Sequence, residues 1–464
     1  MDDVVVVLPG IMGSTLWRND VPLWEPSRGA IGEVLRSHLR SIRGLALAEG
    51  IGDEHPGDGV EARALMPDVR LPLGIWTFDL GYDALLNFLR RTFDLSEGAP
   101  GSDRPANLVP FPYDWRLSNR YNGALLRTVA GDALARWRDQ GGRFADAKLV
   151  FIAHSMGGLV TRWYLDRLGG AEVTRKLITL GTPHRGSLKA LEQLVNGVRK
   201  GPGPFKLNLT TFARSLPSLH QLMPEYACIE QPGNLAKTTE VEVPELTTAM
   251  VADAMEFHTQ IDEGRRSKGS YQLHPVCGFK QPTWTTAAID QGQVIARSTI
   301  NGDDNGGDAT VPRVGAAPVD IDLDSPVISH VADNHGGLVH NQGVFDAIEG
   351  VLTASQVRYR AGEINLAVEV DEVLEAGEAL HIRATLPDDG RAALDAVIAD
   401  ENGRVLDTLR LRSADGAFVA QPTLPGPGLY QVTVQGAGAA RHQVSPITTA
   451  VLAWPPERAV GDPA

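Results

Sequence analysis

Short, continuous apolar runs alternate with segments of helical periodicity over the first three quarters of the chain. Runs rich in Val, Ile and Leu, bounded by Gly or Pro, are typical of strands buried on both faces of a parallel sheet. Apolar residues at helical spacing predict helices between them. The predicted strands are residues 4–8, 149–152, 176–180, 272–278 and 294–300, and the clearest helices are 83–93, 120–139 and a last helix before 352. This alternation predicts a doubly wound, mostly parallel α/β sheet.

Two stretches interrupt this alternation. Residues 17–76 are poorly periodic, with one plausible helix over 31–42, and residues 190–270 carry several prolines among short helical pieces. Insertions between core elements often cover a ligand pocket. We therefore predict cap or lid segments at about 17–76 and 190–270, within a catalytic domain of residues 1–355.

The pattern changes after about residue 355. Short segments alternate apolar and polar positions with a period of two, and turn sequences such as Asp-Gly and Asn-Gly separate them. Roughly a hundred residues of such strands predict a small β-sandwich of immunoglobulin-like type over residues 356–464. The tail from Trp454 is expected to fray. The sequence does not indicate a partner for this domain.

Composition narrows the function classes. The chain has 464 residues and a formal net charge of −14, and the absence of a long Lys/Arg run argues against a nucleic-acid partner. The two cysteines, Cys228 and Cys277, form no disulfide framework and no C-x-x-C metal motif. We find no basic leader with an apolar run and no span long enough to cross a bilayer, so a cytoplasmic protein is expected.

The sequence KLVFIAHSMGGLVTRWY at residues 148–164 has the order strand, sharp turn, helix, with Ser155 at the turn. It matches the nucleophile elbow of α/β-hydrolases, with Ala153 in place of the usual first glycine. Such a turn is strained, and side chains larger than methyl at 153 or 157 are expected to collide with neighbouring backbone. The amide of Met156 begins the helix and is positioned to stabilise an oxyanion.

A nucleophilic serine needs a base and an orienting carboxylate, which follow it in this fold in the order Ser, Asp or Glu, His. The carboxylate candidates are Asp303, Asp304 and Asp308, of which Asp308 is preferred because it lies in the tight Gly-Asp-Ala-Thr-Val-Pro loop. The base candidates are His330, His335 and His340, and the glycine-rich loop before the last helix favours His335. The Asp/Gly-rich loop does not have EF-hand spacing. His154 and His184 are expected to pack or to hydrogen-bond rather than to catalyse.

Six motifs in order resemble the lecithin:cholesterol acyltransferase family, which also includes phospholipases and acyltransferases of diacylglycerol. The resemblance covers roughly residues 4–352. The motifs are PGIMGS at 9–14, PYDWR at 112–116, AHSMGG at 153–158, LGTPHRGS at 180–187, GDATVP at 307–312 and the loop around His335, and PSLHQLMP at 217–224 is a further common segment. Neither the signal peptide nor the disulfide-tied lid of secreted members is expected in this chain.

The resemblance implies a nucleophile at Ser155, an acid at Asp308 and a base at His335. It also implies oxyanion amides at Ile11 and Met156, and a pocket-lining role for Trp24. The function predicted is a serine-dependent lipid acyl-ester hydrolase or O-acyltransferase acting through an acyl-enzyme on phospholipid or acylglycerol, with no metal or cofactor. The partner is a lipid or ester substrate, with a membrane surface left open. The alternatives are a cytoplasmic carboxylesterase acting on small or neutral esters, and an inactive hydrolase-fold binding protein.

Overall fold

The fold is seen in a computed structural model. The structure describes residues 1–25, 44–48, 52–73, 76–98, 104–200, 207–268, 271–304, 306–353, 366–386, 392–401, 403–414, 416–438 and 444–455. The helix predicted over residues 31–42 and most of the C-terminal tail lie outside these residues.

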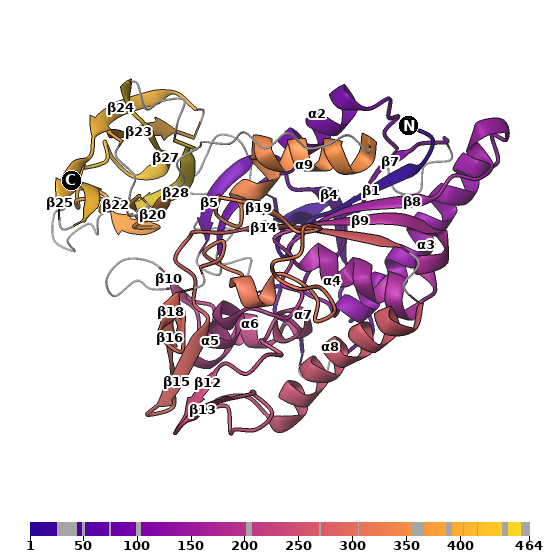
Figure 1. The fold of residues 1–464 in the computed structure, drawn as a ribbon, viewed down its shortest axis with the longest axis horizontal. Coiled ribbons are helices and arrows are strands. Elements are labelled where there is room, and N and C mark those ends of the chain that lie inside the picture. The colour runs from indigo at the N-terminus through magenta and orange to yellow at the C-terminus, as the bar shows by residue number, and fades with distance from the viewer. Residues whose placement is uncertain are drawn as a thin grey trace.

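A six-stranded parallel sheet forms the centre of the N-terminal part of the molecule (Figure 1). Its strand order is β19-β14-β9-β8-β1-β7, and every neighbouring pair is parallel. The loops after the carboxyl ends of the strands therefore gather at one edge, where open α/β sheets bind their ligands. The strands are β1 (Val4–Leu8), β7 (Leu108–Pro110), β8 (Leu149–His154), β9 (Thr174–Leu180), β14 (Gln272–Gly278) and β19 (Ser329–Val331).

Helices cover both faces of this sheet (Figure 1). Successive residues of a strand point to opposite faces, so Val4 and Val6 join a core with α3 and α4, whereas Val5 and Val7 join a core with α2 and α9. Burial on both faces explains the unbroken apolar run of β1. The helices are α2 (Asp83–Thr92), α3 (Asn119–Arg138), α4 (Met156–Arg162) and α9 (Gln342–Thr353), and a π-helical turn, Trp163–Arg167, follows α4.

The described part of the predicted segment 17–76 contains strands that its irregular pattern did not predict. A three-stranded antiparallel sheet has the order β3-β2-β4, and a separate hairpin pairs β5 with β6. The strands are β2 (Ser14–Arg18), β3 (Val21–Trp24), β4 (Val60–Leu65), β5 (Val69–Leu73) and β6 (Trp76–Leu80).

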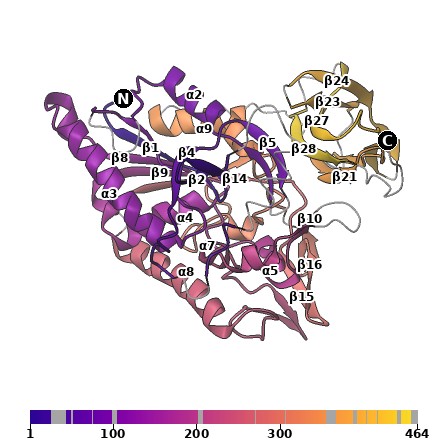
Figure 2. The ribbon, with the colours of Figure 1, turned by 180° about the vertical axis from the view of Figure 1, so that it is seen from behind.

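Residues 190–270 contain a long helix, α8 (Thr248–Lys268), besides the short pieces expected. Arg162 donates from Nη2 to Asp262 Oδ1 at 2.8 Å, so α8 packs against the end of α4 (Figure 2). The boundaries of the cap segments stay a prediction. The other elements are α5 (Leu188–Asn196), β10 (Arg199–Lys200), β11 (Leu207–Asn208), α6 (Thr210–Arg214), α7 (Pro217–His220), β12 (Ile229–Gln231), β13 (Asn234–Ala236), β15 (Thr286–Asp290), β16 (Gln293–Arg297), β17 (Thr299–Ile300) and β18 (Asp303–Asp304).

The C-terminal part is all β, with a four-stranded sheet (β20-β22-β26-β25) and a five-stranded sheet (β21-β28-β27-β23-β24). Apolar side chains of both sheets form one core. This confirms the predicted fold class, an α/β-hydrolase fold followed by a β-sandwich; the immunoglobulin-like type stays a prediction. The strands are β20 (Ala367–Val370), β21 (Val373–Glu375), β22 (Ile382–Thr385), β23 (Leu394–Asp400), β24 (Val405–Arg410), β25 (Arg412–Ala414), β26 (Ala417–Ala420), β27 (Gly428–Gly436) and β28 (Ile447–Trp454).

Candidate active site

Ser155 occupies a strained turn between β8 and α4. Its backbone has φ 51° and ψ −126°, a conformation that residues with a Cβ rarely adopt. The Ser155 amide donates to Leu180 O at 2.8 Å, which ties the turn to the end of the neighbouring strand β9. The strand-turn-helix arrangement that the sequence predicted is therefore present, and it directs the serine side chain toward the loops at the carboxyl edge.

Small residues around Ser155 allow three loops to meet. A Cβ on Gly157 would lie 2.4 Å from Pro9 O, and one on Gly158 would lie 2.1 Å from Thr182 Oγ1. A Cβ on Gly10 would lie 2.8 Å from the Cβ of Ser155. From the sequence, only side chains larger than methyl were expected to be excluded at 157. The structure sets a stricter limit, because even a methyl group would overlap the Pro9 carbonyl.

The structure brings Ser155, His335 and Asp308 together. Ser155 Oγ lies 2.7 Å from His335 Nε2, and His335 Nδ1 lies 2.7 Å from Asp308 Oδ2. The three residues are buried, with exposed fractions of 0%, 2% and 1% respectively. Because a carboxylate only accepts, Nδ1 carries a proton that it donates to Asp308, which leaves Nε2 to accept the serine hydroxyl proton. This is the hydrogen-bond order of a serine nucleophile, its base and an orienting acid.

Backbone amides fix the Asp308 carboxylate. Its Oδ1 accepts from Thr310 N at 3.0 Å and from Val311 N at 2.6 Å, which leaves Oδ2 for His335. The Asp308 carbonyl also accepts from His335 N at 2.7 Å. The next residue, Ala309, has φ 68°. The Gly-Asp-Ala-Thr-Val-Pro sequence thus folds into a turn capped by its own aspartate.

The other candidate acids and bases lie elsewhere. Asp303 and Asp304 form the exposed strand β18. His330 lies in β19, paired with Cys277 of β14, and His340 ends a 3-10 turn over Gly337–His340. Of the candidates weighed from the sequence, the structure places His335 against Ser155 and Asp308 against His335.

The loop after β9 packs against Ser155, Asp308 and His335. Gly181 has φ 56°, and a Cβ there would lie 3.0 Å from Asp308 Oδ2 and 3.1 Å from His335 Nδ1. Thr182 Oγ1 donates to Ser155 O at 2.9 Å. His184 is buried, with Nε2 3.0 Å from Thr179 Oγ1, and burial holds its pKa well below the usual value of 6.5. His184 therefore hydrogen-bonds within the fold, as expected.

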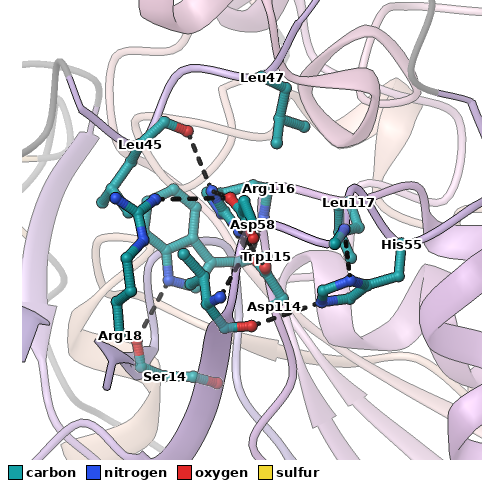
Figure 3. A network of polar contacts seen from close by, with 12 residues as sticks. Ser14, Arg18, Leu45, Leu47, His55, Asp58, Asp114, Trp115, Arg116 and Leu117 are labelled. Atoms are coloured by element: carbon teal, nitrogen blue, oxygen red, sulfur yellow. Dashed lines mark hydrogen bonds and ion pairs between the residues drawn. The ribbon is translucent and has the colours of Figure 1, made fainter. Parts of the chain in front are cut away.

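The Pro-Tyr-Asp-Trp-Arg sequence supports the loop at residues 9–14. Tyr113 OH donates to Pro9 O at 2.8 Å, and the Tyr113 amide donates to Ser14 Oγ at 3.0 Å. Trp115 Nε1 donates to Ser14 O at 3.1 Å (Figure 3). These bonds hold the loop after β1 in position over the serine turn, with Met12 at φ 62°. The motif at residues 112–116 therefore stabilises the loop formed by the motif at residues 9–14.

A buried arginine extends this support (Figure 3). Arg116 is fully buried, and its guanidinium donates to Asp114 Oδ2 at 2.7 Å and to Asp58 Oδ2 at 2.8 Å. Burial opposes ionisation of Asp58, but the bond from Arg116 and the other favourable contacts together outweigh it and lower the pKa of this carboxyl. Arg116 also donates to Leu45 O at 3.3 Å. The network joins residues of the poorly periodic segment 17–76 to the motif at residues 112–116, which supports the loop at residues 9–14.

Ile11, Met156 and Trp24 were assigned to substrate interactions by resemblance. Met156 is the first residue of α4, whose first amides have no acceptor within the helix. Ile11 follows Gly10 and is buried. Trp24 is also buried; its Nε1 donates to Met12 O at 2.8 Å and its ring lies edge-on to Trp115 at 6.1 Å. The oxyanion amides and the substrate contact of Trp24 stay predictions.

His154 forms hydrogen bonds, as expected, but the partners with which it does so were not indicated by the sequence. The Gly10 amide donates to Tyr82 Oη at 2.8 Å, and Tyr82 Oη lies 2.8 Å from His154 Nδ1. His154 Nε2 lies 3.1 Å from His335 O. Burial, with a smaller contribution from His335, lowers the pKa of His154 to about 3. The hydrogen-bonded partners are 72 and 181 positions apart in the sequence, so no local pattern indicated these bonds.

The described residues offer no group of three or more His, Cys, Asp or Glu side chains arranged to hold a metal ion. No helix in the described part of the chain combines the length and apolarity needed to cross a membrane. Cys228 and Cys277 are both buried and free.

Comparison with known proteins gives one family match. Residues 97–264 match the family model of lecithin:cholesterol acyltransferase, which confirms the resemblance over this part of the chain. No curated protein matches the chain. The match supports lipid-ester hydrolase or acyltransferase chemistry in general.

Twelve chains of solved structures also match, and three of them illustrate the degree of similarity. The mature form of Bacillus licheniformis lipase BlEst2 is 12% identical and covers 75% of this chain and 91% of its own, with a TM-score of 0.35. Its propeptide form is 11% identical and covers 74% and 85%, with a TM-score of 0.29. The PKD domain of an M14-like peptidase from a Thermoplasmatales archaeon is 14% identical and covers 20% and 99%, with a TM-score of 0.17. Sequence identities and TM-scores this low do not support any conclusion about function.

Proposed function

We propose that this chain, which is similar to the lecithin:cholesterol acyltransferase family, is a serine-dependent lipid acyl-ester hydrolase or O-acyltransferase. The observation that carries the proposal is the continuous hydrogen-bond path from Ser155 Oγ through His335 to Asp308, with 2.7 Å at both steps. The strained backbone of Ser155 supports it, because such strain is retained where the surrounding structure and function require it.

The proposed reaction has two half-reactions. Ser155 Oγ attacks the ester carbonyl while His335 Nε2 takes the hydroxyl proton, and Asp308 stabilises the imidazolium. The amides of Ile11 and Met156 stabilise the oxyanion. The carbon–oxygen ester bond then breaks, the leaving alcohol takes the proton from His335, and an acyl-enzyme remains. Water or an acceptor alcohol then attacks this acyl-enzyme while His335 Nε2 takes its proton. The bond between Ser155 Oγ and the acyl carbon breaks, the fatty acid or the new ester leaves, and His335 returns the proton to Ser155 Oγ.

The proposed substrates are phospholipids or acylglycerols, and the hydrolase and transferase outcomes share the first half-reaction. A mixed vesicle of phospholipid, diacylglycerol and sterol separates these outcomes when its products are measured by mass spectrometry. Free fatty acid alone identifies a hydrolase, and a new acylated alcohol identifies a transferase. Activity confined to short soluble esters would instead support the plain carboxylesterase. A cytoplasmic location and action at a membrane surface stay predictions.

The Ser155→Ala variant tests the proposal itself. Removing the nucleophile is expected to lower kcat on long-chain acyl esters by about 10⁴-fold or more. Ester hydrolysis by Ser155→Ala at the wild-type rate would contradict the proposal, because the activity would then not depend on this serine. A wild-type chain without ester hydrolysis would instead favour the alternative of an inactive hydrolase fold that only binds.

A further inference from the structure

Two side-chain hydrogen bonds join the C-terminal β-sandwich to the loop that carries His335 and to the segment after β14, which is hydrogen-bonded to the Asp308 loop. Asn334 Nδ2 donates to Thr448 O at 2.8 Å, and Gln281 Nε2 donates to Leu366 O at 2.9 Å. Thr448 lies in β28, and Leu366 directly precedes β20. Strand β28 and the residue before β20 thus each provide one carbonyl to the first domain.

Asn334 connects the sandwich to the His335 loop. It directly precedes His335, and its Oδ1 accepts from Gly337 N at 2.8 Å while its Nδ2 reaches Thr448. The Asn334 side chain therefore bridges the turn that contains His335, from residue 334 to residue 337, and also anchors this turn to the sandwich. Its two functions use different atoms, so they can be separated by substitution.

Gln281 connects the sandwich to the Asp308 loop. Its side chain is buried, with 2% exposed, and its Oε1 also lies 3.4 Å from the Val368 amide. On the other side, the Gln281 amide donates to Gly307 O at 3.0 Å. Thr283 Oγ1 donates to Gln281 O at 2.8 Å and accepts from Ala309 N at 2.9 Å. The residues before and after Asp308 are therefore both bonded to this segment.

A cavity lies between the same two surfaces. Its volume is about 520 Å³, and its lining includes Asp308 and His335 on one side and Val368, Val370 and Ile447 of the sandwich on the other. The space beside the acid and the base is thus bounded by both parts of the chain, and the bonds of Asn334 and Gln281 fix the separation of its walls.

We propose that the C-terminal β-sandwich is a positioning element of the active site, and that it acts through Asn334 on His335 and through Gln281 on Asp308. The inference rests on the proposed function, in which the two hydrogen bonds of His335 must form simultaneously. A carboxylate and a base held on separate loops lose their alignment when either loop shifts, and a shift of about 1 Å can cost on the order of 100-fold in rate.

The test uses the full-length chain with two variants. Asn334→Asp keeps the oxygen that accepts from Gly337 N but removes the donor to Thr448 O. Gln281→Met keeps the side-chain length but removes both polar contacts with the sandwich. The matched control is Thr433→Val, which removes the 2.9 Å bond between the Thr433 and Thr448 hydroxyls inside the sandwich.

We expect both variants to lower the plateau kcat on a long-chain ester, by about 10- to 100-fold, with KM changed much less. The rate of serine labelling by a fluorophosphonate should fall by a similar factor, and Thr433→Val should leave both unchanged. Hydrogen–deuterium exchange of residues 306–312 and 333–340 should rise in the two variants only. This last measurement does not depend on catalysis, so it tests the connection even if the chain is no esterase.

Unchanged kcat and unchanged exchange in either variant, with melting temperatures close to wild type, would overturn the inference. A variant that lowers the melting temperature is compared at a temperature where circular dichroism shows it folded. An equal loss of kcat in Thr433→Val would also overturn it, because the effect would then be one of general destabilisation.

Discussion

The phenol of Tyr82 and the imidazole of His154 share a hydrogen bond of 2.8 Å beneath the serine turn. Its direction is determined by the neighbouring groups. His335 O can only accept, so His154 Nε2 must donate and, in the neutral ring, Nδ1 must accept from Tyr82. Tyr82 Oη in turn accepts from Gly10 N. This series of hydrogen bonds therefore joins the loop at residues 9–14, which carries a proposed oxyanion amide, to the loop that carries the proposed base, His335.

Removing the Tyr82 hydroxyl tests this link. Tyr82→Phe leaves the Gly10 amide and His154 Nδ1 buried without their partner, which should lower the free energy of unfolding by about 1–3 kcal/mol. Because both loops are displaced, kcat should also fall on the order of tenfold, equivalent to about 1.4 kcal/mol in the barrier. Denaturant titration and ester hydrolysis measure the two effects.

A matched variant distinguishes positioning from stability. Tyr226 is also buried and donates to Thr285 O at 3.1 Å, outside the hydrogen-bond chain. Tyr226→Phe should lower stability while leaving kcat near the wild-type value. Equal kcat in Tyr82→Phe and wild type would refute the link between the two loops.

The buried His154 predicts a pH dependence of stability. Its pKa is about 3 in the folded protein, compared with a usual value of 6.5, so below pH 6.5 the unfolded chain binds a proton that the folded protein does not. Stability therefore rises with pH across this window and is lost as the pH falls, by up to about 1.4 kcal/mol per pH unit. His154→Gln should reduce this slope by up to that amount, measured by denaturant titration at several pH values from about 4 to 7. An unchanged slope would mean that His154 does not contribute.

The glycine after Met156 predicts a severe steric effect. Gly157→Ala would bring a methyl group to 2.4 Å from Pro9 O, a backbone atom that cannot move without displacing the loop after β1. We expect a loss of activity of about 100-fold or more, because this loop carries the proposed oxyanion amide of Ile11.

Gly131 supplies the control for that substitution. It lies within α3, and a Cβ added there would meet nothing within 4 Å, so Gly131→Ala should stabilise the chain by up to about 1 kcal/mol. Gly131→Ala should therefore raise the melting temperature and leave ester hydrolysis unchanged, whereas Gly157→Ala should lower both. Full activity of Gly157→Ala would contradict the packing of the elbow against the loop.

The buried arginine in Figure 3 predicts a large stability effect. Arg116→Met leaves the buried Asp114 carboxylate without its 2.7 Å partner, which should cost about 3–5 kcal/mol of unfolding free energy. The comparison is Arg63→Met, which removes an exposed pair with Asp20 and should leave stability close to wild type. Similar costs for the two variants would show that the Arg116 network does not stabilise the fold.

Sequence patterns predicted the elements that depend on local regularity. The run at β1 is apolar at every position because its alternating residues enter two cores, and the Ser155 turn follows a recognisable order of strand, small residues and helix. The loop that carries Asp308 was identified from its tight Gly-Asp-Ala-Thr-Val-Pro sequence, and the aspartate caps that same turn. In each case the physical requirement lies within a few residues.

The features that were missed depend on contacts between distant positions. The helix α8 shows little segregation of apolar residues, since part of its buried side is polar and Asp262 pairs there with Arg162. Tyr82, Asn334 and Gln281 have ordinary local surroundings, and their importance comes from single hydrogen bonds to residues far along the chain. Such bonds have no periodicity, so a single sequence does not indicate them.

The most direct test of a catalytic Ser155 is covalent labelling by an alkyl fluorophosphonate, located by peptide mass spectrometry. The reagent reacts with a serine that a neighbouring base activates. We predict that the label is found on Ser155 in the wild-type chain, and that labelling is abolished in His335→Ala and strongly slowed in Asp308→Asn. A chain that stays unlabelled at Ser155, or that labels equally fast without His335, would contradict the proposed mechanism.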